Sequence, residues 1–330
     1  MSFEATDLVR LNQLNYTKFN KLIYGWVLKM CLRNNKELDK LAKLRVEEHY
    51  QTIVKHLANH DAPIDFLISG ELAQIQTFAI PSISKLLQRT KQYQENGLKR
   101  LDDTRAILTE CMTDSVQSSR GQHMVNHLNW IHDHYDISND DYLYTLALFI
   151  VEPARWMEVF GYRPLTDREK YAGYLAFKSL GQAMRIKHIP ESRDEFITWY
   201  QDYRAEHLAF HPDNKKVTDG LIEGMKEMFP FFIKPFVRPV ILTLINDPEL
   251  LAATGQKPPA RLVQKAIKGI MRLRRLSQKF INPWQKQCFE TSYLGQHYKS
   301  YPGGYQSHVL GPEKIVKHTS GGCPFHASSL

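Results

Sequence analysis

The chain has 330 residues, of which 43% are hydrophobic and 24% charged, a composition that excludes a fibrous or disordered protein and suits a globular one. The net charge of +8 favours anionic partners, but no nucleic-acid-binding motif accompanies it, so we expect no nucleic-acid partner. Four scattered cysteines without a CxxC pair indicate free thiols in a reducing compartment: Cys31, Cys111, Cys288 and Cys323.

The sequence shows no clear secretory signal and no clear membrane-spanning segment. The first residues, MSFEATDLVRLNQ, lack the basic and apolar regions of a secretory signal, and no window is long and apolar enough for a transmembrane helix. The nearest approach, at 229–245, is broken by Lys234, Arg238 and three prolines. We therefore expect a cytoplasmic protein whose contact with a membrane, if it makes one, is peripheral.

Helical periodicity runs through the first third of the chain. Residues 6–60 are amphipathic, and 15–32 are typical of a surface helix. Residues 62–95 hold two apolar segments separated at Pro81. A helix is predicted over 96–112, in which Thr104 shares an apolar stripe with its neighbours one turn away on either side.

Three later helix starts carry a Ser or Thr with an acidic residue three positions on, the pattern of a capping box. The pairs are Ser138/Asp141, Thr166/Glu169 and Ser192/Glu195. Each precedes an apolar-periodic run, so the middle of the chain is predicted to be an array of helices.

The last third contains two unusual segments. Residues 220–255 include the Pro-rich apolar stretch, which we expect to pack against the core. Residues 261–280 form a strongly basic helix with Leu262, Ala266, Ile270 and Leu273 on one face. We interpret this helix as covering the core, with a lipid-facing surface as the alternative. From Tyr298 the chain is predicted to be irregular.

Arg100 and Thr104 lie four residues apart, so both point to the same side of the predicted helix. A buried guanidinium needs a partner. Asp103 provides one at helical spacing, which gives a structural ion pair. The alternative is that Arg100 and Thr104 face a ligand such as an oxygen species, a carboxylate or a propionate.

The stretch RGQHMVNHLNWIHDH places His123 and His127 at i and i+4, where both imidazoles can reach one metal ion. Trp130 and His134 extend the same face. A neutral imidazole is also a common axial ligand of haem iron. Satisfied surface or core histidines are the simpler interpretation, and the HExxH pattern of zinc hydrolases is missing.

Six segments, in order along the chain, resemble the haem-dependent oxygenase family that includes rubber oxygenase (latex-clearing protein) and the fungal ER-bound oxygenase of mycophenolic acid biosynthesis. The resemblance covers about residues 65–220 and is closer to the fungal branch. The segments are FAIPSISKLL (78–87), KRLDDT (99–104), RGQHMVNHL (120–128), YDISNDDYLYTLALFIVEPARW (135–156), GYRPLTDREKYA (161–172) and MRIKHIPES (184–192).

The resemblance implies an all-α fold, a single large multi-helix domain enclosing haem b between its helices. It implies oxidative cleavage or oxidation of a C=C bond in a hydrophobic isoprenoid or lipid-like substrate, with O2 as co-substrate bound by ferrous haem. His123 matches the proximal iron ligand. Arg100 and Thr104 match the family's Arg-x-x-x-Thr spacing in the haem pocket, where they would stabilise the bound oxygen.

Two departures from the rubber-cleaving branch concern the catalytic groups. That branch has a distal lysine just before the threonine, where this chain has Asp103, and a glutamate base upstream of the arginine, whereas residues 72–94 contain no Glu or Asp. Asp103 is therefore the catalytic-site position expected to differ most. The fungal relative also carries a membrane span that we do not find here.

We divide the chain into an N-terminal helical segment (1–64), an oxygenase-like core (65–220), a C-terminal helical segment (221–297) and a tail (298–330). Two other functions stay open. One is a non-haem metalloenzyme using His123, His127 and a carboxylate such as Asp103 or Glu110. The other is a non-enzymatic lipid- or membrane-binding protein using 229–245 and 261–280. The tail motif GGCPFH, with Cys323 and His326, is interpreted as terminal rather than ligating.

Overall fold

A computed structural model describes residues 32–317, which are folded into helices with no β-strand, so the all-α prediction is confirmed there. The predicted helix over 15–32 lies almost entirely outside these residues, as do Cys31, Cys323 and the GGCPFH motif. The two cysteines that are described, Cys111 and Cys288, are free thiols as predicted. In the described part of the chain, no helix combines the length and apolar character that crossing a bilayer requires.

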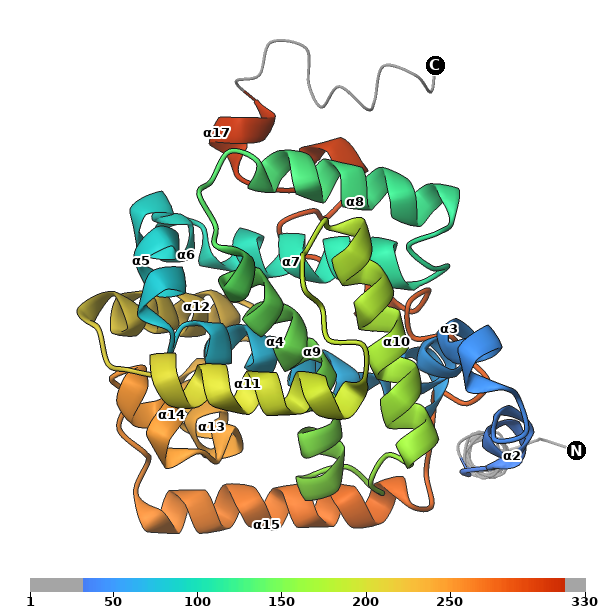
Figure 1. Cartoon of the computed structure of the whole chain (residues 1–330). Helices are drawn as coiled ribbons and strands as arrows, with labels where there is room; N and C mark the ends of the chain where they lie inside the picture. The colour runs from blue at the N-terminus through green and yellow to red at the C-terminus, as the bar shows by residue number, and fades with distance from the viewer. Residues whose placement is uncertain (1–31, 318–330) are drawn as a thin grey trace, which may run out of the picture.

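The helices follow one another through short connections (Figure 1). They are α2 (Lys36–Leu41), α3 (Val46–His56), the π-helix η1 (Leu57–Asp61), α4 (Pro63–Thr77), α5 (Pro81–Thr90), α6 (Gln92–Glu95), α7 (Gly97–Met112), α8 (Ser119–His132), α9 (Asn139–Val159), α10 (Asp167–Ala183), α11 (Arg193–His207), α12 (Pro212–Glu227), α13 (Lys234–Ile245), α14 (Pro248–Ala253), α15 (Arg261–Gln278), α16 (Tyr293–Gln296), the 3-10 helix η2 (Ser307–Val309) and α17 (Glu313–Val316).

Helices α4 and α9 pack against each other at the centre of the molecule, and the other helices surround them (Figure 1). Helix α4 has little polar face, and its second half is buried throughout. Its buried Gln76 donates a hydrogen bond from Nε2 to Glu152 on α9 over 2.6 Å, and Arg155 pairs with the same carboxylate. These bonds satisfy polar groups that would otherwise be costly in the core.

The three predicted capping positions are confirmed as helix N-caps. The hydroxyls of Ser138, Thr166 and Ser192 each accept a hydrogen bond from the backbone N–H three residues on, which begins α9, α10 and α11. The reciprocal bond of a full capping box forms at Thr166, whose N–H donates to Glu169 over 2.8 Å. Local sequence therefore sets these boundaries.

Residues 298–317 pack into the fold as a largely irregular segment. Leu310 is fully buried, and Lys99 on α7 donates a hydrogen bond to the carbonyl of Gly311 over 2.7 Å. The Tyr305 hydroxyl donates to Glu110, also on α7, over 2.8 Å. This segment therefore helps to fix the position of α7.

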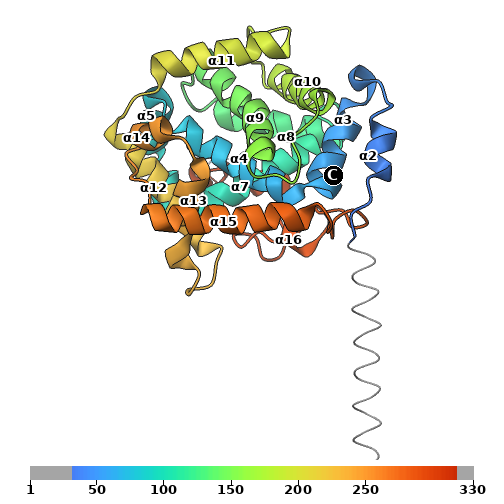
Figure 2. The same cartoon turned by 90° about the horizontal axis from the view of Figure 1, so that it is seen from below.

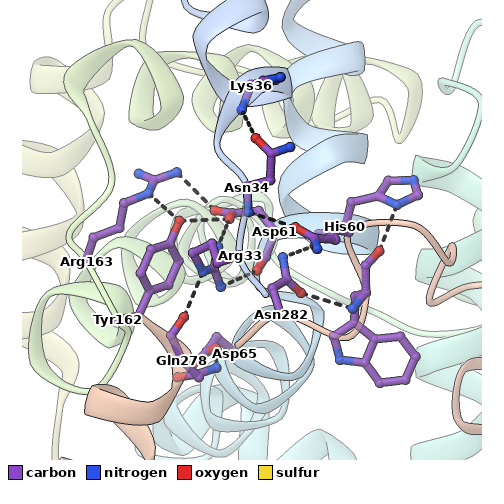
Figure 3. A network of polar contacts seen from close by, with 12 residues as sticks. Arg33, Asn34, Lys36, His60, Asp61, Asp65, Tyr162, Arg163, Gln278 and Asn282 are labelled. Carbon is purple, nitrogen blue, oxygen red and sulfur yellow. Dashed lines mark hydrogen bonds and ion pairs between the residues drawn. The ribbon is translucent and has the colours of Figure 1, made fainter. Parts of the chain in front are cut away.

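A buried polar network joins the first described residues to the end of α15 (Figure 3). Asp61 accepts hydrogen bonds from Arg33, Arg163 and Tyr162 at 2.5, 3.0 and 2.8 Å. The Nε of Arg33 also donates to the carbonyl of Gln278 over 2.7 Å. Segments far apart in sequence are thereby held together by one carboxylate and one guanidinium.

Two expectations for the last third, that residues 220–255 pack against the core and that α15 covers it, are confirmed only in part. The face of α15 that carries Leu262, Ile270 and Leu273 is turned to solvent instead of covering the core, and no residue of this helix is buried. In the Pro-rich stretch, Val237 and residues 242–245 do pack inward, but Phe231 and its aromatic neighbours before α13 are exposed. On α15 the inward positions are taken by other side chains of the same helix.

Glycines permit the close approach of α12 to the start of α7. A Cβ at Gly224 would lie 2.5 Å from the carbonyl carbon of Gly97 and 2.7 Å from the nitrogen of Leu98. Since backbone atoms cannot step aside, Gly224→Ala is expected to lower the free energy of unfolding by about 1–3 kcal/mol. Urea denaturation followed by circular dichroism measures this.

The matched control is Gly269→Ala on α15, where an added Cβ meets nothing within 4 Å. This control should raise stability by up to about 1 kcal/mol, because alanine is the better helix former. Equal effects of the two substitutions would contradict the proposed role of the close contact.

Candidate functional site

A largely apolar cavity of about 240 Å³ lies between α3, α4, α7, α9 and α10 and is closed on one side by Phe289 and Tyr298 from the C-terminal part of the chain. Its α7 wall consists of residues one helical turn apart, among them Leu101, Thr104 and Leu108. Phe149 on α9 and Phe177 on α10 stack on each other at 5.6 Å between ring centroids. The cavity suits a hydrophobic ligand.

Thr104 on α7 and Gln74 on α4 are two of the polar residues that line the cavity, and they are connected to Arg100. Gln74 donates hydrogen bonds from Nε2 to Tyr93 over 2.9 Å and to Thr104 over 3.2 Å. The Thr104 hydroxyl donates to the carbonyl of Arg100 over 2.9 Å and accepts from the Arg100 guanidinium. The predicted proximity of Arg100 and Thr104 is therefore present, although Arg100 lies behind the cavity wall.

Arg105 and Glu71 are two cavity groups that the sequence analysis did not single out. The Nε and Nη1 atoms of Arg105 are buried and make no hydrogen bond within the described residues, and the nearest carboxylate, that of Asp102, is 3.6 Å away. Burial raises the pKa of the Glu71 carboxyl, and the charge of Arg105 opposes this shift. Glu71 immediately precedes residues 72–94, which contain no carboxylate side chain. Arg105 follows Thr104 directly and so lies off the helix stripe that Arg100 and Thr104 share, which is why helical spacing did not point to it.

The predicted ion pair between Asp103 and Arg100 is wrong, because the Asp103 carboxylate has other partners. The Asp103 carboxylate accepts hydrogen bonds from Lys99 at 2.9 and 3.2 Å and from the Tyr301 hydroxyl. Burial raises the pKa of Tyr301, and the neighbouring Asp103 charge adds to this effect. Tyr301 is 198 residues away in sequence, so helical spacing alone could not reveal it.

The histidine face predicted on α8 is directed toward the C-terminal segment. His127 is fully buried, and its Nε2 lies 2.8 Å from the carbonyl oxygen of Leu310. His123 is half-buried one turn earlier, close enough for its charge to lower the pKa of His127, though burial contributes most to that shift. His134 is exposed, with its Nδ1 2.8 Å from the carbonyl of Trp130. His127 and His134 therefore contact backbone carbonyl groups within the fold.

His132, in the last turn of α8, is the histidine coupled to Arg100. Its Nδ1 is buried and has no hydrogen-bond partner within residues 32–317. Burial lowers the pKa of His132 to about 4, and the positive charge of Arg100 acts in the same direction, so the imidazole is neutral at pH 7. Its ring lies 5.4 Å from that of Tyr142 on α9. At 100° per residue it falls off the His123–His127 stripe, which is why periodicity missed it.

Residues 66–277 match the family described as ER-bound oxygenase mpaB/B'/Rubber oxygenase, catalytic domain. The chain belongs to this family. Its match runs from α4 to α15 and so includes most of the cavity lining, Arg100, Thr104 and all of α8. The C-terminal segment that holds Asp103 and closes the cavity lies beyond the match.

Fungal members of this oxygenase family are similar to the chain over part of their length. ER-bound oxygenase mpaB' of Penicillium brevicompactum is 29% identical over 276 residues, which are 78% of this chain and 65% of that protein. ER-bound oxygenase mpaB of the same organism is 35% identical over 199 residues, 55% of this chain and 50% of that protein. ER-bound oxygenase mpaB of Penicillium roqueforti is 33% identical over 199 residues, which are 55% of this chain and 66% of that protein. The chain thus spans between half and two thirds of these relatives.

The non-haem alternative requires several metal ligands in one place. Within residues 32–317, no group of three or more His, Cys, Asp or Glu side chains is arranged to hold a metal ion. Of its two candidate carboxylates, Asp103 is bound by Lys99 and Tyr301, and Glu110 by Arg120 and Tyr305. The geometry of this family member therefore gives that alternative no support.

Proposed function

We propose that the protein is a haem b-dependent oxygenase that uses O2 to oxidise or cleave a C=C bond in a hydrophobic isoprenoid or lipid-like substrate. The observation that carries this proposal is the largely apolar cavity, most of whose lining lies in the family-matched region, with polar groups set among its apolar side chains. Such a lining binds apolar molecules and uses its few polar groups to orient them. The family's named oxygenases supply the reaction class.

The side chains around the cavity are of the kinds that haem needs. The Nε and Nη1 atoms of Arg105, which make no hydrogen bond within the described residues, can donate to carboxylates such as propionates, and apolar walls can enclose the porphyrin. A neutral histidine is the form that ligates iron, and His132, on α8 outside the cavity lining, has this form. The volume of about 240 Å³ lies below the roughly 300–1,000 Å³ of typical small-molecule sites, so the walls must part to admit haem.

Two histidines of α8 compete for the role of iron ligand. The family resemblance assigns His123, whereas burial, neutrality and coupling to Arg100 favour His132. We propose His132, because its imidazole is buried and neutral and lies within electrostatic range of Arg100, whose guanidinium donates to Thr104 on the cavity wall. His123 stays the alternative, and single substitutions distinguish the two.

When bound, haem would supply the reaction with O2. The chain's own groups would then position the reactants. Thr104 and Gln74 line the cavity and are held in place by their hydrogen bonds to each other, to Arg100 and to Tyr93. The aromatic and aliphatic walls orient an alkene and exclude water. Glu71, whose pKa is raised by burial, can accept or return a proton at its carboxylate. Asp103 would affect the site indirectly, by fixing the position of α7, because its carboxylate is bound by Lys99 and Tyr301.

An absorption spectrum of the full-length protein, purified from haem-supplemented cells, tests the proposal. We expect a red protein with a Soret band that shifts on dithionite reduction, and one haem b per chain by pyridine haemochrome assay. O2 consumption with squalene as the alkene probe, with carbonyl products identified by mass spectrometry, then tests the reaction. A colourless protein free of iron and porphyrin would overturn the haem assignment.

A further inference from the structure

Helix α15 presents an apolar row to solvent. Leu262, Ile270 and Leu273 are 79, 67 and 69% exposed, and Ala266 lies on the same side. These positions recur at helical spacing, so they form one continuous row along the helix. A row of this length, fully uncovered, is unusual for a helix on a soluble surface, where the apolar face normally packs inward.

The inner side of α15 is held by polar contacts instead. Arg274 forms a two-pronged ion pair with Asp65 on α4, at 2.8 and 2.9 Å, and Gln278 donates to the same carboxylate over 2.9 Å. Ile267 and Met271, in the two turns before these contacts, pack against the core. The outward orientation of the apolar row is therefore enforced, because reversing the helix would strand the buried Asp65 carboxylate.

A basic row runs beside the apolar one. The basic residues follow each other at alternating spacings of four and three, which places them on one flank of the helix. They are Arg261, Lys265, Lys268, Arg272, Arg275 and Lys279. No Asp or Glu occurs in sequence between Glu249 and Glu290, so this part of the chain provides no charge of opposite sign.

An aromatic turn lies next to α15. Between α12 and α13 the chain exposes Phe229, Phe231 and Phe232, with Phe231 exposed by 82%, and Phe236 is exposed in the first turn of α13. Helix α13 packs on α15, and Figure 2 shows the turn projecting past the edge of α15. Exposed aromatic and aliphatic groups beside a basic row match the interfacial region of a lipid bilayer.

We propose that α15 and the 229–236 turn form a docking surface for membranes that contain anionic lipid. The apolar row and the aromatic groups would enter the interfacial region, while the basic row contacts the headgroups. A second copy of this chain is a poorer occupant, because a symmetric pairing would bring two rows of the same charge together. The surface does not depend on the oxygenase chemistry, and it would bring a lipid-like substrate close to the cavity.

Sedimentation of the full-length protein with vesicles tests the proposal. We expect binding to phosphatidylcholine vesicles that contain phosphatidylserine, and much weaker binding to phosphatidylcholine alone or at high salt. Removal of two basic charges by Lys265→Gln with Arg272→Gln should weaken binding about thirtyfold, as two charges at about 1 kcal/mol each predict. The variant Leu262→Ser with Ile270→Ser and Leu273→Ser should lose binding at low salt as well.

The matched control for charge is Lys91→Gln with Lys187→Gln, which removes two exposed lysines, one at the α5–α6 junction and one after α10. This control should bind like the wild type. Circular dichroism melting curves should show all three variants folded, since the changed side chains are exposed. Failure of the wild type to bind either vesicle, or equal binding by all variants, would overturn the proposal. A dimer that the serine variant abolishes would assign the surface to a second copy of the chain instead.

Discussion

His132→Ala is expected to abolish the Soret band of the purified protein, while His123→Ala leaves most of it in place. The Nδ1 of His132 is buried without a hydrogen-bond partner in the described structure, and its imidazole is neutral at pH 7 because burial and Arg100 both lower its pKa. We expect the haem affinity to fall by more than roughly tenfold, the lower end of the loss seen when even an outer partner of a metal ligand is removed. Haem titration of the apoprotein measures this.

Exogenous imidazole separates a lost ligand from a lost fold. If His132→Ala removes the ligand, imidazole should restore part of the Soret band, because it can occupy the space left by the side chain. His134→Ala is the matched control, since His134 is an exposed histidine two residues away. The opposite pattern, in which His123→Ala loses haem and His132→Ala retains it, would return the ligand assignment to His123.

Asp65→Ala should lower the free energy of unfolding by about 3–5 kcal/mol, the usual cost of breaking a buried ion pair by removing one partner. The Asp65 side chain is fully buried and accepts hydrogen bonds from Arg274, Gln278 and the indole of Trp156. The substitution leaves all three donors without their acceptor and frees the inner side of α15. Urea denaturation of the full chain gives the change.

Asp167→Ala is the control for this experiment. Asp167 pairs with Lys170 on the surface and its side chain is 99% exposed, so the loss should stay below about 1 kcal/mol. A double replacement, Asp65→Leu with Arg274→Met, should recover part of the stability, because it removes both buried charges. If Asp65→Ala costs no more than Asp167→Ala, the contact does not anchor α15.

Local features of the fold could be predicted from the sequence. The capping residues Ser138, Thr166 and Ser192 begin helices because their hydroxyls satisfy backbone N–H groups within the same few residues. Arg100 and Thr104 meet for a similar reason, since four residues complete about one helical turn. The family, too, could be recognised from the order of its segments, and the match to residues 66–277 agrees.

Residue partnerships across long sequence separations could not be predicted. Asp103 has suitable cations at i−3 and i−4, and only the packing of residues 298–317 on α7 brings Tyr301 to it and leaves Lys99 as its cation. The coupling of His132 to Arg100 likewise depends on how α7 packs against α8. Periodicity reports which residues share a helix face and says nothing of what that face meets.

Helix α15 has one feature that local sequence determines and one that depends on tertiary packing. The sequence by itself determined that 261–280 is a helix with an apolar row and a basic row, because side-chain spacing in a helix is fixed by backbone geometry. The tertiary structure decided which row turns inward. Asp65, 209 residues before Arg274, is a buried carboxylate that must be paired, and the cost of leaving it unpaired exceeds the gain from covering a few aliphatic side chains.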